Sequence, residues 1–242
     1  MSIRFVARAA TAFALIPAFA FAQLAPEDDA VVVTATRFPR ADPNIPANVS
    51  VITREDIRRS PAVTLTDVLK SQTGLEMRPL YGPLGIDATL DVRGFGAAAG
   101  NNTLLLLDGQ RLNPVSGDGI NWSMIPLASI RRIEIIRGNG TVLYGDRASG
   151  GVVNIITDKS GKPRASVAAS LGSFGYRSTD AVVAGGEGGT SDVYYTLAGH
   201  YAETSGYRTN SQQDEKSLAG RVGLRTGFGE GFVDYGVYES SN

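Results

Sequence analysis

The sequence predicts two folded parts: a small α+β domain of short strands and helices, then antiparallel strands of the kind that build a transmembrane β-barrel. Two observations carry this prediction. Residues 125–157 contain two strands, apolar on both faces, joined by a glycine-rich turn, so other elements must cover them. From residue 164 the pattern changes to alternating apolar and polar residues in segments of about ten, separated by turns.

Composition excludes several kinds of site. The 242 residues carry a net charge of −1, so no basic surface indicates nucleic-acid binding. The chain has no cysteine, which excludes disulfides and thiolate metal sites. The single histidine, His200, lies on an alternating strand and is expected to be structural or at the surface. We assign no catalytic residue, metal or cofactor.

Residues 1–22 have the pattern of a secretory signal peptide. Two arginines precede the apolar run Ala9–Ala20, and residues 20–22 provide the small side chains that a signal peptidase recognises. Cleavage is predicted before Gln23. The alternative is a membrane anchor, but the run is short for a bilayer span and no charged stop follows it.

Residues 23–46 form a proline-containing tail with one β-prone segment. A run of three valines, Val31, Val32 and Val33, lies in this tail. A lone strand has unpaired backbone groups, so we expect it to add to the edge of a partner's sheet.

The α+β domain is expected over residues 47–160. Thr64 and Asp67 have the spacing of a helix capping box, and Asp108-Gly109 is a hairpin-turn signal. The expected helical segments are Arg54–Arg59 and the run from Leu65 to Leu69, and the expected strands are Val49–Thr53, Leu75–Arg78, Thr89–Arg93, Thr103–Leu107, Arg131–Arg137 and Val152–Thr157.

Residues 161–242 are expected to contain about five transmembrane strands. A polar loop is predicted at Thr204–Glu215 and a turn at Gly227–Gly231. Between them, Arg221 and Arg225 lie on the opposite face from Leu218, Val222 and Leu224. The alternative is the edge of a soluble sandwich. Because closed barrels need about eight strands or more, we expect an incomplete barrel that belongs to a truncated chain and is unstable alone.

Several ordered motifs resemble one family. These are Asp67-Val68-Leu69, Gly74-Leu75, Asp91-Val92-Arg93-Gly94-Phe95, Leu107-Asp108-Gly109, SIRRIEIIRG at 129–138, LYGD at 143–146 and GGVVNIIT at 150–157. Together they resemble the plug domain of TonB-dependent outer-membrane receptors. The resemblance implies that residues 47–160 fill a 22-stranded barrel in a Gram-negative outer membrane. It also implies a monomeric importer that contacts outer-membrane lipid and has no enzymatic activity.

The resemblance also implies partners and site residues. The tail segment Asp29, Ala30, Val31, Val32, Val33, Thr34 and Ala35 looks like the TonB box, which pairs with TonB of the inner-membrane energising complex. A metal-chelate ligand would contact the apical loops through Tyr81, Gly82, Pro83, Leu84, Asn113, Asn121 and Trp122. The two aromatic residues among them have an alternative role in packing against the barrel wall.

Arg93 and Arg137 each precede a glycine at a strand end and would hold the plug against barrel glutamates, the alternative being two solvated arginines. Segments 107–113 and 150–157 resemble the vitamin B12 receptor branch, which leaves ferric siderophore, haem and cobalamin open as substrates. Two other classes stay open: a passive porin- or adhesin-like barrel, and a periplasmic enzyme. The second is disfavoured because the plug lacks a Ser-His-Asp, paired-carboxylate or His-cluster arrangement.

Overall fold

The computed structural model describes residues 48–79, 84, 87–187 and 192–241, with the backbone alone at Val32–Val33, Arg40–Ala41, Glu187 and Asp192. The described residues all belong to one compact unit. The predicted signal peptide lies outside the described residues, and so does most of the predicted TonB box. Within the described part of the chain, no helix has the length and apolar character needed to cross a membrane.

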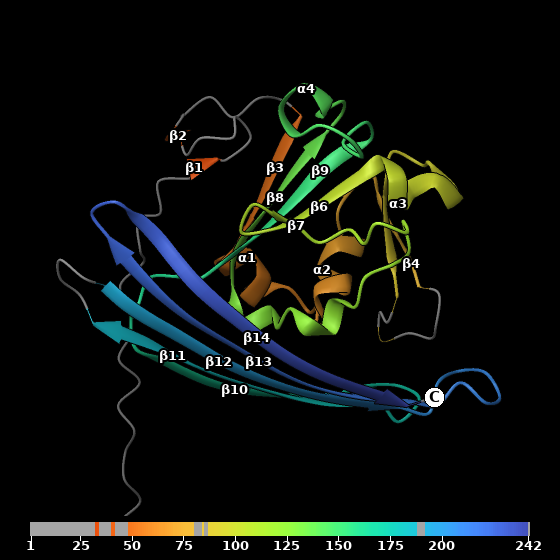
Figure 1. Cartoon of the computed structure of the whole chain (residues 1–242). Helices are drawn as coiled ribbons and strands as arrows, with labels where there is room; N and C mark the ends of the chain where they lie inside the picture. Colours follow the sequence, from red (N-terminus) through yellow and green to blue (C-terminus); the bar gives the residue numbers. More distant parts are fainter. Residues whose placement is uncertain are drawn as a thin grey trace, which may run out of the picture. The chain divides into compact units, whose positions relative to one another are not determined.

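The α+β domain is built from short elements (Figure 1). Its helices are α1 (Arg54–Arg59), α2 (Leu65–Lys70), η1 (Gly96–Ala98), α3 (Ala99–Asn102), η2 (Trp122–Met124), η3 (Leu127–Ser129) and α4 (Thr141–Tyr144). Its strands are β3 (Val49–Thr53), β4 (Leu75–Arg78), β5 (Thr89–Val92), β6 (Thr103–Leu107), β7 (Gln110–Arg111), β8 (Ile130–Arg137) and β9 (Gly151–Thr157). The predicted strands and helices of this domain are therefore confirmed to within two residues.

The main sheet of this domain has the order β3-β8-β9-β6-β7, and a separate pair is formed by β4 and β5. Strands β6 and β9 run parallel, whereas β8 pairs antiparallel with both β3 and β9. Both faces of these strands bury apolar side chains, as the sequence predicted, but the face of Val152 also buries Glu134 and Asn154. One face packs with α1, α2 and the β4–β5 pair in a core that contains Leu69, Ile133, Val153 and Ile155.

Two capping boxes fix where the first helices begin. Thr53 and Thr64 each accept a hydrogen bond from the third residue of the helix, and the aspartates there bond back to the threonine backbone. The second box confirms the prediction for Thr64 and Asp67. This satisfies amide groups that would otherwise be unpaired at each helix start. The helices α1 and α2 are thereby held at the ends where the chain leaves a strand or loop.

The C-terminal sheet consists of five antiparallel strands in sequence order. These are β10 (Arg164–Leu171), β11 (Arg177–Glu187), β12 (Asp192–Thr204), β13 (Gln213–Thr226) and β14 (Gly229–Ser241). The described strands do not close into a barrel, since β10 and β14 are the two edges. Leu218, Val222 and Leu224 are exposed on one face, whereas Arg221 is buried on the other, as the alternation predicted.

The strands are longer than the sequence pattern indicated. The predicted loop Thr204–Glu215 is wrong at both ends, because β12 continues to Thr204 and β13 begins at Gln213. The predicted turn Gly227–Gly231 narrows to two residues, since Thr226 already pairs with Gly229. Backbone pairing continues through these polar ends because main-chain hydrogen bonds do not depend on side-chain polarity.

Candidate functional site at the junction of the two sheets

At the junction of the main sheet and the C-terminal sheet, the first element is the turn between β6 and β7. Leu107 pairs with Gln110, so Asp108 and Gly109 form a two-residue hairpin loop. Both have positive φ angles, 51° and 83°, which this kind of tight turn requires. The turn is fixed from beneath because the Asp108 amide donates to the Ile155 carbonyl at 2.8 Å. This turn therefore holds the Asp108 carboxylate at the end of the main sheet.

The Asp108 carboxylate is surrounded by donors. It accepts hydrogen bonds from the Thr157 amide at 3.0 Å and from the Thr157 hydroxyl at 2.7 Å. The Arg221 guanidinium of β13 donates to the same carboxylate, and the Lys159 ammonium lies 4.0 Å away. The Asp108 side chain is only 2% exposed. It is thus a buried anion whose partners come from both the α+β domain and the C-terminal sheet.

Arg221 reaches from the C-terminal sheet to this anion. Its guanidinium forms a two-pronged contact with Asp234 on β14, at 2.5 and 2.8 Å, and also donates to the Thr157 hydroxyl at 2.6 Å. The same group lies 4.6 Å from the centroid of the Phe232 ring. A planar guanidinium suits this task because its five donors spread over several acceptors at once. The contact joins two segments 113 residues apart.

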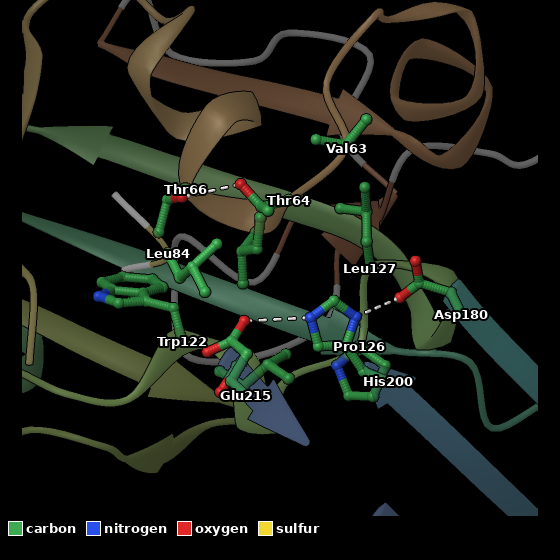
Figure 2. A pocket seen from close by; sticks show the side chains of 13 residues that line it. Val63, Thr64, Thr66, Leu84, Trp122, Pro126, Leu127, Asp180, His200 and Glu215 are labelled. Carbon is green, nitrogen blue, oxygen red and sulfur yellow. Dashed lines mark hydrogen bonds and ion pairs between the residues drawn. The ribbon is translucent and has the colours of Figure 1, made fainter. Parts of the chain in front are cut away.

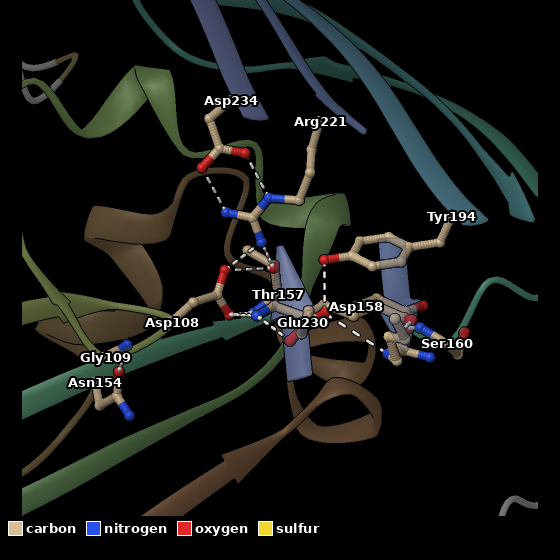
Figure 3. A network of polar contacts seen from close by, with 12 residues as sticks. Asp108, Gly109, Asn154, Thr157, Asp158, Ser160, Tyr194, Arg221, Glu230 and Asp234 are labelled. Carbon is tan, nitrogen blue, oxygen red and sulfur yellow. Dashed lines mark hydrogen bonds and ion pairs between the residues drawn. The ribbon is translucent and has the colours of Figure 1, made fainter. Parts of the chain in front are cut away.

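A second set of contacts extends the junction. Lys159 pairs with Glu230 at 3.3 Å, and the Tyr194 hydroxyl donates to the other Glu230 oxygen at 2.6 Å. Tyr194 lies flat across Gly223 of the adjacent strand, where an added Cβ would meet the ring at 2.1 Å. The glycine therefore makes room for the ring, which carries its hydroxyl to Glu230. These contacts and those of Arg221 form one network, the Asp108–Arg221 network (Figure 3).

Asp158 joins the start of α1 to the linker between the two parts. It pairs with Arg54 at 2.9 Å and with Arg164 at 2.8 Å, and accepts from the Ser160 amide at 3.0 Å. Burial alone would raise its pKa, but the charge of Arg54 and the hydrogen bonds from Ser160 outweigh burial and lower the pKa to about 2. The carboxylate therefore stays ionised and anchors the linker at neutral pH.

The predicted ligand residues Leu84 and Trp122 lie close to a bridge between Ala88 and Ile120. Ala88 and Ile120 exchange backbone hydrogen bonds, each at 3.2 Å. Trp122 secures this contact, since its indole N–H donates to the Ala88 carbonyl at 2.8 Å. The indole is 2% exposed and faces Leu84 across a small cavity (Figure 2). Trp122 thus packs in the interior, and its contact with a ligand stays a prediction.

The other predicted ligand residues fall into two groups. Asn113 is buried, where its side chain accepts from the Leu105 amide at 2.7 Å and donates to the Thr103 carbonyl at 3.0 Å. Asn121 caps η2 by accepting from the Ser123 amide at 3.0 Å. The predicted residues Tyr81, Gly82 and Pro83 lie outside the described residues.

The glutamates predicted to face Arg93 and Arg137 belong to barrel strands expected beyond residue 242, so only the contacts of the two arginines inside this chain are described. Arg137 donates to the Thr73 carbonyl at 3.1 Å and to the Ser50 hydroxyl at 2.5 Å, both within the α+β domain. Arg93 is exposed and has a positive φ of 75°. Within the described strands of the C-terminal sheet, neither arginine has an ion pair with a glutamate. Their holding role stays a prediction.

No local sequence signal predicts the Asp108–Arg221 network. The alternation of β13 placed Arg221 on the polar face, but that pattern is common to barrel strands. Its partner is a turn residue more than a hundred positions earlier, so only the folded chain brings the two together. In the tail, Val32–Val33 pairs antiparallel with Arg40–Ala41, whereas Asp29, Ala30, Val31, Thr34 and Ala35 of the predicted TonB box lie outside the described residues.

Comparison with known proteins supports both parts of this architecture. Residues 42–152 match the family model described as the TonB-dependent receptor plug domain. The chain is 37% identical over 186 residues to the vitamin B12 transporter BtuB of Vibrio vulnificus. That alignment covers 77% of this chain and 30% of the relative, so the chain spans less than a third of its length.

Solved structures show the same fold. The siderophore receptor PirA of Acinetobacter baumannii superposes with a TM-score of 0.62 at 24% identity, covering 80% of this chain and 32% of that one. The siderophore receptor PirA of Pseudomonas aeruginosa gives a TM-score of 0.56 at 26% identity, covering 81% of this chain and 36% of that one. In both, the matched region spans about a third of the solved chain.

Proposed function

The chain belongs to the TonB-dependent receptors, and we propose that it serves the energised import of a large metal chelate across the outer membrane. The observation that carries this proposal is the combination of a plug domain at residues 42–152 with five antiparallel strands that contact it through buried polar groups. The 37% identity to a vitamin B12 transporter favours cobalamin, and the likeness to siderophore receptors makes a ferric siderophore the second candidate.

The proposed mechanism gives each part a physical task. The ligand binds on the side of the plug formed by the loops before Ala88 and Trp122. Binding makes the tail segment Asp29–Ala35 available to TonB, which adds it as a strand to its own sheet. Force from the inner membrane then moves the plug, and the Asp108–Arg221 network resists that movement.

The Asp108–Arg221 network suits a plug that must stay closed until it is pulled. Its carboxylate and guanidinium are both buried, so separating them leaves an uncompensated charge in a poorly hydrated site. The contact is local and reversible, since neither side is covalently joined. The energy barrier to plug movement is therefore high without force, and the plug returns to its position when the Asp108–Arg221 contact forms again.

The test is uptake of labelled cobalamin and of ferric siderophores by cells that depend on this protein. Val32→Pro removes a backbone donor from the predicted TonB box, whereas Val32→Ala shortens the side chain and keeps the donor. We expect the proline variant to bind ligand normally and to lose accumulation, and the alanine variant to keep most of both. Accumulation that survives Val32→Pro would instead support the passive barrel.

A further inference from the structure

The one histidine of the chain lies between two carboxylates beneath the plug. His200 is on β12, directly opposite Asp180 of β11, and Glu215 comes from β13 on the other side. The imidazole Nδ1 is 2.7 Å from an Asp180 oxygen, and Nε2 is 3.1 Å from a Glu215 oxygen (Figure 2). The side chains of His200 and Glu215 are 8% and 1% exposed. We call these three residues the His200 cluster.

The geometry of the His200 cluster fixes its proton count. A neutral imidazole has one N–H, and an ionised carboxylate can only accept. Both short contacts are therefore hydrogen bonds only if the cluster holds one proton more than a neutral histidine and two carboxylates. The imidazolium form meets this requirement, with one N–H directed at Asp180 and the other at Glu215.

The plug covers the His200 cluster. The His200 cluster and the plug together line a small cavity, to which the plug contributes uncharged residues, among them Thr64, Thr66, Leu84, Trp122, Pro126 and Leu127. The segments η2 and η3 pack on β11, β12 and β13, and the Ser217 hydroxyl donates to the Ser123 carbonyl at 3.0 Å. The plug side of the cavity is thus formed by the segment 122–127 together with residues 63–66 and Leu84, and of these the segment 122–127 is the part that packs on the strands.

Other titratable groups near the His200 cluster do not take the place of its proton. The Tyr176 hydroxyl interacts with Asp180 and Glu215 of the cluster, and also with Asp67 of α2. Asp67 is already used in the capping box with Thr64. The second Glu215 oxygen is buried without a hydrogen-bond partner. Nor does any set of three His, Asp or Glu side chains in the described residues have an arrangement that holds a metal ion.

We propose that the His200 cluster is a proton-dependent latch that holds the plug segment 122–127 against the C-terminal sheet. With the imidazolium, one positive charge lies between two negative ones, and the cavity stays closed. Without the extra proton, two carboxylates face each other through a neutral ring in a site with little water. Water must then enter, and it does so by separation of segment 122–127 from strands β11–β13. The proposal goes beyond import and does not depend on which ligand is carried.

The size of the effect follows from the charges. The contacts of 2.7 and 3.1 Å on either side of the ring place the two carboxylate oxygens about 7–8 Å apart. Two like charges at this separation and an effective dielectric constant of about 20 shift an opening equilibrium by roughly 40-fold. We therefore expect loss of the proton to increase the open population of segment 122–127 by about 40-fold. The opening exposes the Trp122 indole N–H, which is otherwise bonded to the Ala88 carbonyl.

Two nuclear magnetic resonance measurements on the protein in lipid nanodiscs test the proposal. Within these 242 residues His200 and Trp122 are the one histidine and the one tryptophan, and their signals are assigned from spectra of His200→Gln and Trp122→Phe. The imidazole ¹⁵N shifts report whether both ring nitrogens carry protons, and we expect two N–H groups near neutral pH. Indole N–H exchange, corrected for its intrinsic pH dependence, should lose about 40-fold protection in the pH range where the second N–H disappears. A neutral imidazole near neutral pH, or protection without that step, would overturn the proposal.

Two variants separate the effect of the proton on opening from the effect of side-chain packing. Asp180→Asn with Glu215→Gln removes both carboxylates and keeps side-chain size, so we expect the pH step in indole exchange to vanish while protection stays high. His200→Gln keeps the carboxylates and loses the ring charge, so we expect low protection at every pH. If the His200 variant does not fold, the carboxylate variant still decides the matter, because a pH step that persists in it would contradict the latch.

Discussion

Replacing Arg221 by glutamine tests whether the Asp108–Arg221 network holds the plug. The change removes the guanidinium that donates to Asp108, Thr157 and Asp234. Removing one partner of a buried ion pair costs about 3–5 kcal/mol. Asp108 keeps two hydrogen bonds from Thr157, and Asp234 is 44% exposed and can be rehydrated, so we expect the lower end, about 3 kcal/mol.

Amide hydrogen exchange measures this loss where it occurs. The Thr157 amide donates to Asp108 at 3.0 Å, so opening of the network exposes it. A cost of about 3 kcal/mol lowers its protection by roughly 150-fold. Arg208→Gln is the matched control, because Arg208 lies in the same part of the chain on an exposed loop. Protection in Arg221→Gln within about threefold of wild type would refute the reasoning.

A double variant sharpens the same test. Asp108→Asn in the Arg221→Gln background removes the buried negative charge that the single change leaves uncompensated. We therefore expect the double variant to be better protected at Thr157 than Arg221→Gln alone. If the two changes simply add, the two side chains do not act as a pair.

Three further predictions concern the plug itself. Asp158 has a pKa lowered from 3.8 to about 2, so its ionised form contributes about 2 kcal/mol to folding stability above pH 4. This stability is lost as the pH falls toward 2. Acid unfolding should show the loss, and Asp158→Asn should remove it. Thr64→Ala should cost about 1 kcal/mol by removing the cap of α2, seen as faster exchange of the Asp67 amide and not of the Asp56 amide at the other capping box. Trp122→Phe should cost about 1 kcal/mol in chemical denaturation through loss of the bond to Ala88. Because the indole is 2% exposed, we expect ligand affinity to stay unchanged, whereas a tenfold loss of affinity would support the predicted contact of Trp122 with the ligand.

The elements of the plug could be predicted from the sequence because their signals are local. The capping box at Thr64, the turn at Asp108-Gly109 and the strand before Arg137 each depend on residues within a few positions. The ends of the long C-terminal strands were predicted less accurately. Polar residues near Thr204 and Gln213 suggested a loop, but the neighbouring strands supply backbone partners that extend the pairing.

The sequence alone determined the order of the parts, the family resemblance and the two faces of each C-terminal strand, because these depend on composition and on a period of two. Only the tertiary structure decided which charges meet. Arg221 was assigned a face but no partner, and His200 was expected to be structural or exposed without its two carboxylates. Their partners lie 13 to 113 residues away in the chain, and contacts over such separations are set by strand register and sheet packing.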